Sequence, residues 1–215
     1  MAQDLRALVQ RARSGDRAAF GQLVRKYQRR VYATAFRMTG NHADADDVSQ
    51  EALIRAYRGL AGFNLQSDFF TWLYRIVINV SLNHLRRTSR RRTLSVDDVT
   101  LPEDAEKSTG ADPARALELK QMTVDIGNAL AELPDSLRAT VVLVIFDGLP
   151  YKDAAEILEC SEGTVAWRVH EARKKLREPL ARYLEKTKDA AAGTKKSSAT
   201  SAAKPSDKRH AGSER

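Results

Sequence analysis

The sequence predicts an all-α protein of two small helical domains joined by a flexible linker. Apolar residues recur at three- and four-residue steps through residues 1–92 and again through residues 121–185, as on the buried faces of helices. Residues 93–120 are instead rich in Asp, Glu, Ser and Pro, which is typical of a linker running into the first helix of the next domain. No stretch is dominated by the alternation typical of a half-buried strand.

The net charge of +8 is unevenly distributed along the 215 residues. Residues 1–92 carry +10, residues 93–120 carry −4, residues 121–185 carry −3 and residues 186–215 carry +5. Such segmentation indicates separate tasks for the segments rather than a uniformly basic coat. The last segment is rich in Lys, Ala and Ser and has no aromatic residue, so we expect it to be a disordered basic tail.

Cysteine usage and hydropathy indicate a cytoplasmic protein. Cys160 is the only cysteine, which excludes a disulfide within the chain and a cysteine-rich zinc site. Met1–Gln10 lacks the apolar core of a signal peptide, and no apolar run approaches the roughly 20 residues that span a bilayer. We therefore expect no membrane insertion.

The first domain is predicted to contain three main helices. Apolar side chains between positions 20 and 35 form one buried face of the first helix, and Gly40 is a plausible C-terminal stop for that helix. A second helix is expected from about Asp44 to about Leu60, since its first turn is acidic. Asp68 is a candidate cap for a third helix that continues to about Arg87.

Four aromatics fall within six residues of this third helix. A basic cluster follows them at Arg86, Arg87 and residues 90–92. Because aromatic faces stack on unpaired bases and arginines neutralise phosphates, the pair of features predicts binding to melted nucleic acid. Helical spacing assigns Leu73, Ile76, Val77 and Val80 to the core, and it leaves Trp72 open between core and DNA.

The second domain is predicted to begin with a helix from about Leu117 to Leu133. Pro134 then opens an apolar helix that ends at the turn of residues 147–150. Val141–Phe146 is rich in β-branched residues, so a strand is the alternative there.

Residues 151–177 show a helix-turn-helix pattern. Tyr151–Leu158 forms the first helix and Ser161 caps the second, which buries Val165, Val169, Ala172 and Leu176. The opposite face suits a major groove; the alternative is a plain helical hairpin with a solvated basic face. On either reading Trp167 could fold back onto Tyr151, and His170 could contact phosphate or pack. The opposite face carries Ala166, Trp167, Arg168, His170, Arg173, Lys174 and Arg177.

A polar, acidic face is predicted on the second helix of the first domain. Asp47, Gln50 and Glu51 lie at positions i, i+3 and i+4, which suits docking on a basic partner helix. Two alternatives are a solvated helix start and a metal site built with Asp44. Only His42 adds a histidine nearby, so we predict no metal.

These features together resemble the extracytoplasmic-function group of the sigma-70 family, the alternative sigma factors of bacterial RNA polymerase. The resemblance spans about residues 17–180. Asp44–Ala52 looks like the polymerase-binding helix of region 2. Phe69–Ile76 with Asn79 and Asn83–Arg87 looks like the promoter-melting helix. Region 4 is matched by Leu133-Pro134, Gly148–Tyr151, Gly163–Val165 and His170–Leu176.

The resemblance implies a non-enzymatic function without cofactor. Residues 1–92 would form sigma region 2, and residues 121–185 would form sigma region 4. The partners would be core RNA polymerase (clamp helices and flap), promoter DNA and an anti-sigma factor. The protein would be cytoplasmic and nucleoid-associated in holoenzyme. Region 2 would bind polymerase through Asp47, Gln50 and Glu51. It would bind and melt the −10 element through Asn64, Gln66, Ser67, Phe69, Phe70, Arg75, Asn79, Asn83, Arg86 and Arg87. Region 4 would read the −35 element through Thr164, Ala166, Trp167, Arg168, His170, Arg173, Lys174 and Arg177.

Four positions depart from the family pattern. Phe70 and Ile78 stand where basic residues are common, Glu159 where a turn glycine is usual, and Trp167 where a small polar residue is common. Glu159 puts a tight left-handed turn in doubt. Two other functions compete: a stand-alone helix-turn-helix regulator acting as a dimer, and an enzyme with a helical carboxylate site.

Overall fold

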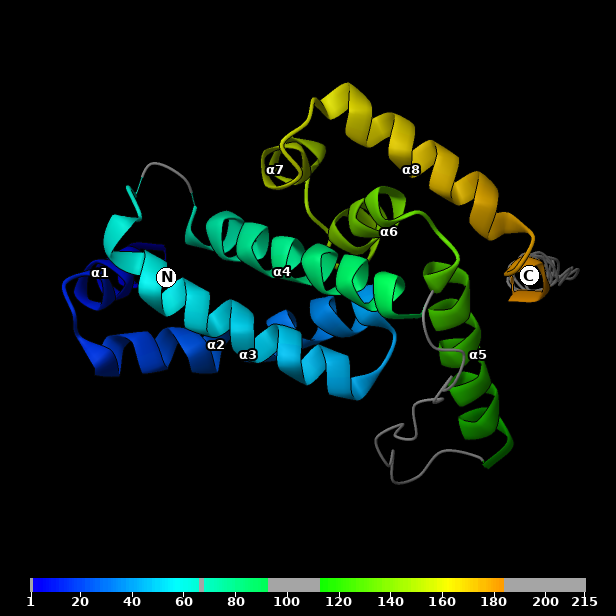
Figure 1. The fold of residues 1–215 in the computed structure, drawn as a ribbon, viewed down its shortest axis with the longest axis horizontal. Helices are drawn as coiled ribbons and strands as arrows, with labels where there is room; N and C mark the ends of the chain where they lie inside the picture. Colours follow the sequence, from blue (N-terminus) through cyan, green and yellow to red (C-terminus); the bar gives the residue numbers. More distant parts are fainter. Residues whose placement is uncertain (1, 66–67, 93–112, 184–215) are drawn as a thin grey trace, which may run out of the picture. The chain divides into compact units, whose positions relative to one another are not determined.

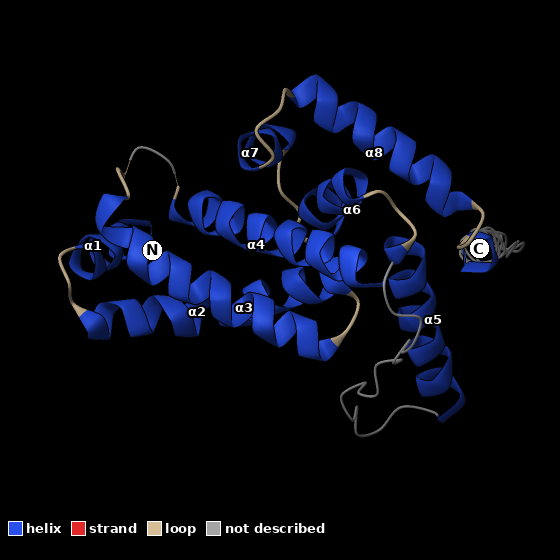
Figure 2. Ribbon diagram, viewed as in Figure 1, coloured by secondary structure: helices blue, strands red, loops and turns tan. Residues whose placement is uncertain are grey.

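The computed structural model describes residues 2–65, 68–92 and 113–183, and every regular element in these ranges is a helix (Figure 2). None of these helices is long and apolar enough to cross a lipid bilayer. The described residues up to Pro179 form one compact unit. Beyond them, residues 181–183 are helical, and Tyr183 N donates to the Leu180 carbonyl at 3.1 Å. The elements are α1 (Ala2–Arg13), α2 (Arg17–Thr39), α3 (His42–Gly59), η1 (Leu60–Gly62), α4 (Phe69–Arg92), α5 (Pro113–Ala131), α6 (Asp135–Val141), η2 (Val142–Phe146), α7 (Tyr151–Ile157) and α8 (Glu162–Arg177).

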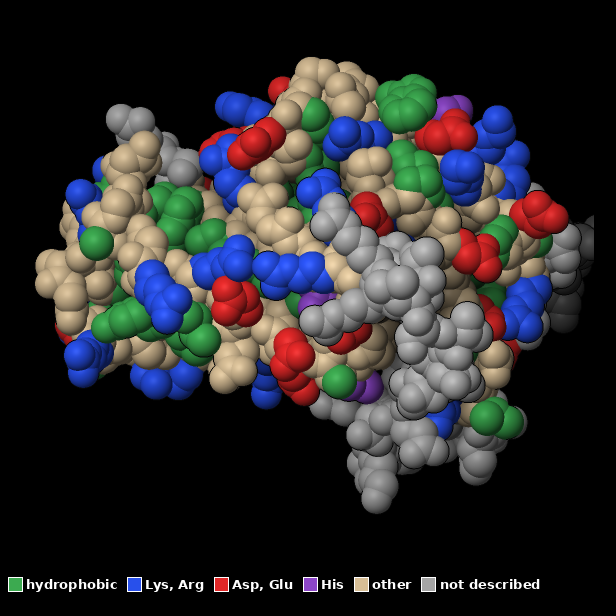
Figure 3. All heavy atoms as spheres, in the orientation of Figure 1, with side chains coloured by type: hydrophobic (Ala, Val, Ile, Leu, Met, Phe, Trp, Pro, Cys, Tyr) green, Lys and Arg blue, Asp and Glu red, His purple; other side chains and the backbone are tan. Residues whose placement is uncertain are grey.

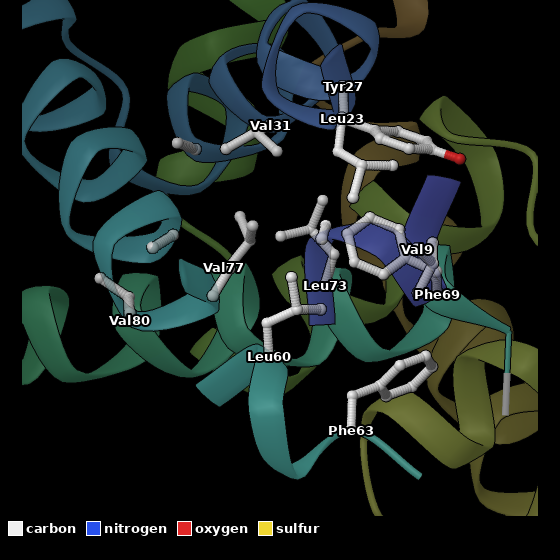
Figure 4. Close-up of a cluster of buried hydrophobic side chains, with 14 of the residues drawn as sticks. Val9, Leu23, Tyr27, Val31, Leu60, Phe63, Phe69, Leu73, Val77 and Val80 are labelled. Atoms are coloured by element: carbon white, nitrogen blue, oxygen red, sulfur yellow. The ribbon is translucent and has the colours of Figure 1, made fainter. Parts of the chain in front are cut away.

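The first domain is built from α1 to α4, with α2, α3 and α4 packed against one another (Figure 1). Its core contains the residues that the helical periodicity predicted, including Leu23, Val31, Leu73 and Val77, each at most 2% exposed (Figure 4). Ile76 is half-buried at the edge of this core. One face each of α2 and α4 thus holds the domain together.

Local capping explains where the helices of the first domain begin and end. Gly40 ends α2 with φ +84°, as predicted. Asn41 then accepts a hydrogen bond from Asp44 N at 2.8 Å, so α3 begins at His42, two residues before the predicted start. Asp68 Oδ1 accepts from Phe70 N at 2.7 Å, which confirms the predicted cap. The helix α4 continues to Arg92, five residues past the predicted end.

The second domain contains α5 to α8. The apolar helix after Pro134 begins as α6 and widens into the π-helical turn η2, in which Asp147 N donates to the Val142 carbonyl at 3.0 Å. The strand alternative for Val141–Phe146 is therefore wrong. Gly148, with φ +69°, ends this segment.

The helix-turn-helix pattern is confirmed in α7 and α8. Ser161 Oγ accepts a hydrogen bond from Thr164 N at 3.1 Å, which is the predicted cap. Val165, Val169 and Ala172 are buried, as expected for the inner face of α8. Glu159 adopts φ +51°, so the left-handed turn forms without a glycine. The doubt that Glu159 raised about this turn is removed.

The two helical domains lie in contact rather than apart. Met38, Tyr74 and Ile78 of the first domain share one buried cluster with Val142 and Leu143 of the second. The linker residues 93–112 and the basic tail 184–215 lie outside the described residues. The two domains are therefore joined through a common apolar interface.

Candidate nucleic-acid and polymerase interfaces

The outer face of α8 carries the residues predicted to read duplex DNA. Trp167 is 61% exposed, and no aromatic contact or hydrogen bond involves it among the described residues. Neither the fold nor Tyr151 therefore sequesters its indole. Figure 3 shows Lys and Arg side chains beside exposed apolar and His side chains along this helix. Ala166, Trp167, His170, Arg173, Lys174 and Arg177 are all exposed.

Two of the predicted α8 residues help to hold the turn. Thr164 Oγ1 lies 2.9 Å from Ser161 Oγ, so its hydroxyl is engaged in the cap. Arg168 Nη1 donates to Cys160 Sγ at 3.7 Å and is half-buried. Of the α8 cations predicted to contact DNA, Arg173, Lys174 and Arg177 are thus exposed, and they lie toward the C-terminus of the helix.

The aromatic run of α4 is used mainly inside the protein. Phe69 is 5% exposed and packs 5.6 Å from Tyr27, measured between ring centroids. Tyr74 is fully buried, and Phe70 lies 4.1 Å from it under the guanidinium of Arg30. In this structure neither Phe69 nor Tyr74 offers a ring face to a base, contrary to what their spacing suggested.

Trp72 packs inside the protein, which is one of the two alternatives, core and DNA, that the sequence left open. Its ring lies 5.1 Å from Phe63 and 5.6 Å from Phe69, between centroids. A Cβ added to Gly59 would come within 3.4 Å of Trp72 Cζ2, so glycine there leaves room for the indole. The tryptophan therefore fixes the end of α3 against the start of α4.

The polar residues predicted for −10 binding fall into three groups. Asn79, Asn83, Arg86 and Arg87 are exposed on α4, and Asn64 is exposed in the preceding loop. Arg75 is held by the second domain: its Nη2 donates to the Glu156 carbonyl at 3.1 Å. Gln66, Ser67 and the side chains of residues 89–92 lie outside the described part of the chain.

The predicted polymerase residues line a groove of ≈ 460 Å³ between α3 and α4. Asp47, Gln50 and Glu51 form one side, as their spacing predicted, and the other side brings Asn83 and Arg87 from α4. The groove therefore mixes residues predicted to bind polymerase with residues predicted to bind DNA. Its walls also include Val48, Ile54, Arg55, Val80 and His84.

Charged side chains make contacts with one another in and beside this groove. Glu51 Oε1 accepts from Arg55 Nε at 2.6 Å, one helical turn away, which offsets part of the acidic character. His84 Nε2 lies 2.9 Å from Asp44 Oδ1 but does not form a hydrogen bond with it. Within the described ranges, no three His, Cys, Asp or Glu side chains gather closely enough to hold a metal ion.

Sequence reasoning missed two buried charged residues where the domains meet. Asp147 Oδ2 accepts from Thr34 Oγ1 at 2.9 Å, and its Oδ1 lies 3.2 Å from Arg37 Nη1. Burial raises the pKa of Asp147, although Thr34 and Arg37 oppose that shift. Arg138 is 7% exposed and donates to three backbone carbonyls. A charged residue inside an apolar helix was the signal available for Arg138.

Two family matches cover most of the described chain. Residues 23–91 match Sigma-70 region 2, and residues 123–176 match Sigma-70, region 4. The RNA polymerase sigma-H factor of Pseudomonas aeruginosa is 40% identical over 180 residues, which cover 80% of this chain and 92% of that protein. The ECF RNA polymerase sigma-E factor of Escherichia coli K12 is 37% identical over 171 residues, covering 77% of this chain and 88% of that protein.

Solved structures show the same architecture. CnrH, in complex with the cytosolic domain of CnrY, is 27% identical with a TM-score of 0.61, covering 82% of this chain and 97% of CnrH. The sigma factor RpoE of Bartonella quintana, bound to the anti-sigma factor NepR, is 25% identical with a TM-score of 0.61, covering 75% of this chain and 96% of RpoE. With these sequence and structural matches, the chain belongs to the extracytoplasmic-function group of the sigma-70 family.

Proposed function

We propose that this chain is an alternative sigma factor that binds core RNA polymerase through the α3–α4 groove, opens the −10 element with α4 and reads the −35 element with α8. The observation that carries the proposal is the presence of two unlike surfaces on one chain. One is a groove with an acidic side, and the other is an exposed basic helix with a tryptophan. A stand-alone duplex reader needs only the second.

The proposed −35 contact follows from the outer face of α8. Its cationic residues Arg173, Lys174 and Arg177 are placed to neutralise phosphates, which position the helix on the duplex. Trp167 and His170 lie nearer the N-terminal half of the helix and are proposed to reach base edges. An indole can contact the methyl group of thymine, which distinguishes that base in the major groove.

The proposed −10 contact shifts from aromatic stacking to polar side chains. Since Phe69 and Trp72 pack inside the first domain and Tyr74 packs between the domains, the exposed residues Asn79 and Arg86 become the main candidates on α4. The loop residues Asn64, Gln66 and Ser67 remain the proposed contacts for a base taken out of the stack.

The proposed partners extend beyond DNA. One structural neighbour is a sigma factor solved with an anti-sigma factor, and another, CnrH, was solved with the cytosolic domain of CnrY. By analogy we propose that an anti-sigma factor also controls this chain. Its proposed place of action is the cytoplasm, at the nucleoid when it is bound to polymerase.

Run-off transcription tests the proposal. Core polymerase and promoter fragments are combined with the wild-type chain or with a variant carrying Asp47→Ala and Glu51→Ala. Transcripts that need the wild type and are lost with the variant support the polymerase contact. Asp46→Ala, an exposed carboxylate on the same helix outside the groove, is the matched control and should keep activity. Discrete duplex shifts by the chain alone, without any transcript, would instead identify a stand-alone regulator.

A further inference from the structure

The helix α2 carries a group of exposed cations that the proposed DNA and polymerase contacts do not use. Its sequence contains no Asp or Glu, so no carboxylate of the same helix offsets its Lys and Arg side chains. Four of these cations are exposed within six positions of the chain, and we call them the α2 basic face. The α2 basic face consists of Arg25, Lys26, Arg29 and Arg30.

The charge of the α2 basic face is not compensated by its surroundings. Among the described residues, no ion pair or hydrogen bond engages any of its four side chains. Residues four positions apart within the face carry like charges, which destabilises a helix. On α3, by contrast, Glu51 pairs with the exposed Arg55 one turn away. Uncompensated positive charge on one side of a helix favours an anionic ligand.

Arg30 brings this charge to the first turn of α4. The centre of its guanidinium lies 4.6 Å from the centre of the Phe70 ring, and Phe70 is itself only partly buried. Phe70 stands where a basic residue is common in the family that the sequence resembles. In this chain, α2 therefore supplies a cation at a point of the surface where α4 has an aromatic ring.

Two carboxylates near this point are already engaged. Asp68 Oδ1 accepts a hydrogen bond from Phe70 N at 2.7 Å and caps α4. Asp147 accepts a hydrogen bond from Thr34 at 2.9 Å and pairs with Arg37 at 3.2 Å. Neither carboxylate forms an ion pair with the α2 basic face, so the four cations are available to an anion from outside.

The α2 basic face and the polar residues proposed for the −10 element lie on different sides of α4. Phe70 and Asn79 are separated by about two and a half helical turns, so their side chains point in opposite directions. A strand bound at Asn79 reaches α2 by passing around the N-terminal end of α4, beside the exposed Asn64. Duplex DNA is too stiff to follow such a path, whereas a single strand can follow it.

We propose that the α2 basic face binds the phosphates of single-stranded DNA that continues from the −10 contacts of α4. The inference rests on the proposed function of α4 in opening the −10 element. Residues four positions apart on a helix are about 6 Å apart along its axis, close to the roughly 7 Å spanned by two nucleotides of one strand. Because phosphate contacts carry no base information, the face adds affinity without changing the preferred sequence.

The salt dependence of single-strand binding by the full chain tests the proposal. Fluorescence anisotropy measures the affinity for a pool of random 16-nucleotide single strands at several salt concentrations. Arg25→Gln combined with Arg29→Gln removes two charges from the α2 basic face. The matched control combines Arg6→Gln with Arg58→Gln, which removes two exposed arginines from α1 and α3. Circular dichroism verifies equal helix content in all samples.

We expect the α2 double variant to lower the affinity at least fivefold at low salt. It should also reduce the slope of log affinity against log salt by about 1.4, since each phosphate contact with a single strand contributes about 0.7. The control variant should change both quantities much less. An unchanged slope in the α2 variant, or the same change in the control, would overturn the proposal.

A second pair of variants tests the role of Arg30 beside Phe70. Arg30→Gln should weaken single-strand binding several-fold and reduce the salt slope by about 0.7. Adding Phe70→Arg to this variant returns a cation to the same point from α4 and should restore the slope. A combined variant that keeps its helix content but binds as weakly as Arg30→Gln would refute the importance of charge at this point.

Two other ligands test the class of anion. A random 16-base-pair duplex and a 16-residue polyglutamate peptide are titrated with the wild type and the α2 double variant. We expect the loss to be largest for the single strand. An equal loss on the duplex would overturn the assignment to single strands. A loss confined to polyglutamate would replace DNA with an acidic protein as the partner.

Arg86→Gln on α4 distinguishes a failure of this inference from a failure of the proposed function. If Arg86→Gln weakens single-strand binding and the α2 double variant does not, the −10 role of α4 stands and the α2 inference is wrong. If only the α2 double variant weakens binding, strands bind α2 without continuing from α4, which refutes the proposed path. If both weaken binding, the strand contacts both helices as proposed.

Discussion

Arg138 Nη1 donates a hydrogen bond to the backbone carbonyl of Met38 at 2.8 Å, joining two residues 100 positions apart in the sequence. Its Nη2 donates to the carbonyls of Ala131 at 2.6 Å and Leu133 at 3.2 Å. These carbonyls lie at or just beyond the C-terminal ends of α2 and α5, where helices leave acceptors unpaired. A single buried cation thus closes two helix ends and links the two domains, and its burial lowers the pKa of Arg138.

Replacing this cation should destabilise the whole unit. Arg138→Met is expected to lower the free energy of unfolding by about 3 kcal/mol, because three buried carbonyls lose their donor. Arg138→Lys should recover only part of that loss, since an ammonium lacks the planar fork of a guanidinium. Urea unfolding followed by circular dichroism measures both. The control Arg58→Met, at an exposed position, should stay within about 0.5 kcal/mol of wild type, and a similar value for Arg138→Met would contradict the assigned role.

Local features of the fold could be predicted from the sequence. The spacing of Leu23, Val31 and Val77 identified buried helix faces, because burial on a helix follows its 3.6-residue period. Gly40, Asp68 and Ser161 were recognised as helix boundaries, because a cap depends only on the few residues around it. The outer face of α8 followed from the same period.

Contacts between distant segments could not be predicted. The four aromatics of α4 indicated base stacking, but Phe69 and Tyr74 are buried by α2 and by the second domain. The helical period predicts the direction in which a side chain points, but it does not predict which other element of the fold covers that side chain. For the same reason Ile78 stood out in the sequence only as a missing basic residue, whereas in the structure it belongs to the interface between the domains.

The closed arrangement, in which the two domains share their apolar interface, should depend on pH through Asp147. Burial raises the pKa of Asp147 above its ordinary value of 3.8, so the closed state binds a proton more tightly than an open state in which the carboxylate is hydrated. The stabilisation from protonation is complete below pH 3.8 and is lost as the pH rises through the raised pKa. Closure should therefore weaken as the pH rises from below 3.8 through the raised pKa of Asp147.

Fluorophores attached at Arg58→Cys and Lys175→Cys, two exposed positions, in a Cys160→Ala background report the distance between the domains, which is recorded over a series of rising pH values. Asp147→Asn carries no titratable group and should remove the part of the pH dependence that belongs to Asp147. Asp153→Asn, on α7, is the matched control and should retain the wild-type profile. If Asp147→Asn showed the same pH dependence of the distance as the wild type, groups other than Asp147 would govern closure.

Two glycines should respond to the same substitution with opposite signs. At both Gly40 and Gly127 an added Cβ would meet no atom within 4 Å, so packing plays no part. Gly40 has φ +84°, and Gly40→Ala should destabilise the protein by about 1–2 kcal/mol. Gly127 lies inside α5, where Gly127→Ala should stabilise it by roughly 0.5–1 kcal/mol. Thermal unfolding of the two variants decides the point, and shifts in the same direction would contradict the assigned backbone conformations.

The exposed face of α8 should separate sequence readout from general affinity. Trp167→Ala, which removes a side chain that is 61% exposed, should change the preferred base at one position of the −35 element and cost about 1–3 kcal/mol on the preferred site. Arg177→Ala should weaken binding about equally on all sequences, because a phosphate contact carries no base information. It should also reduce the dependence of log affinity on log salt by about one.

Both effects can be measured by selecting duplexes from a random library with polymerase and each variant, followed by titration at several salt concentrations. Lys175→Ala, also exposed on α8 but outside the proposed contacts, is the control and should alter neither selection nor salt slope. The two variants are informative together, since they separate base reading from phosphate binding on a single helix. If Trp167→Ala weakened all duplexes equally and left the selected sequence unchanged, the indole would be acting as a general contact, and base reading would have to be assigned to His170 or Arg173.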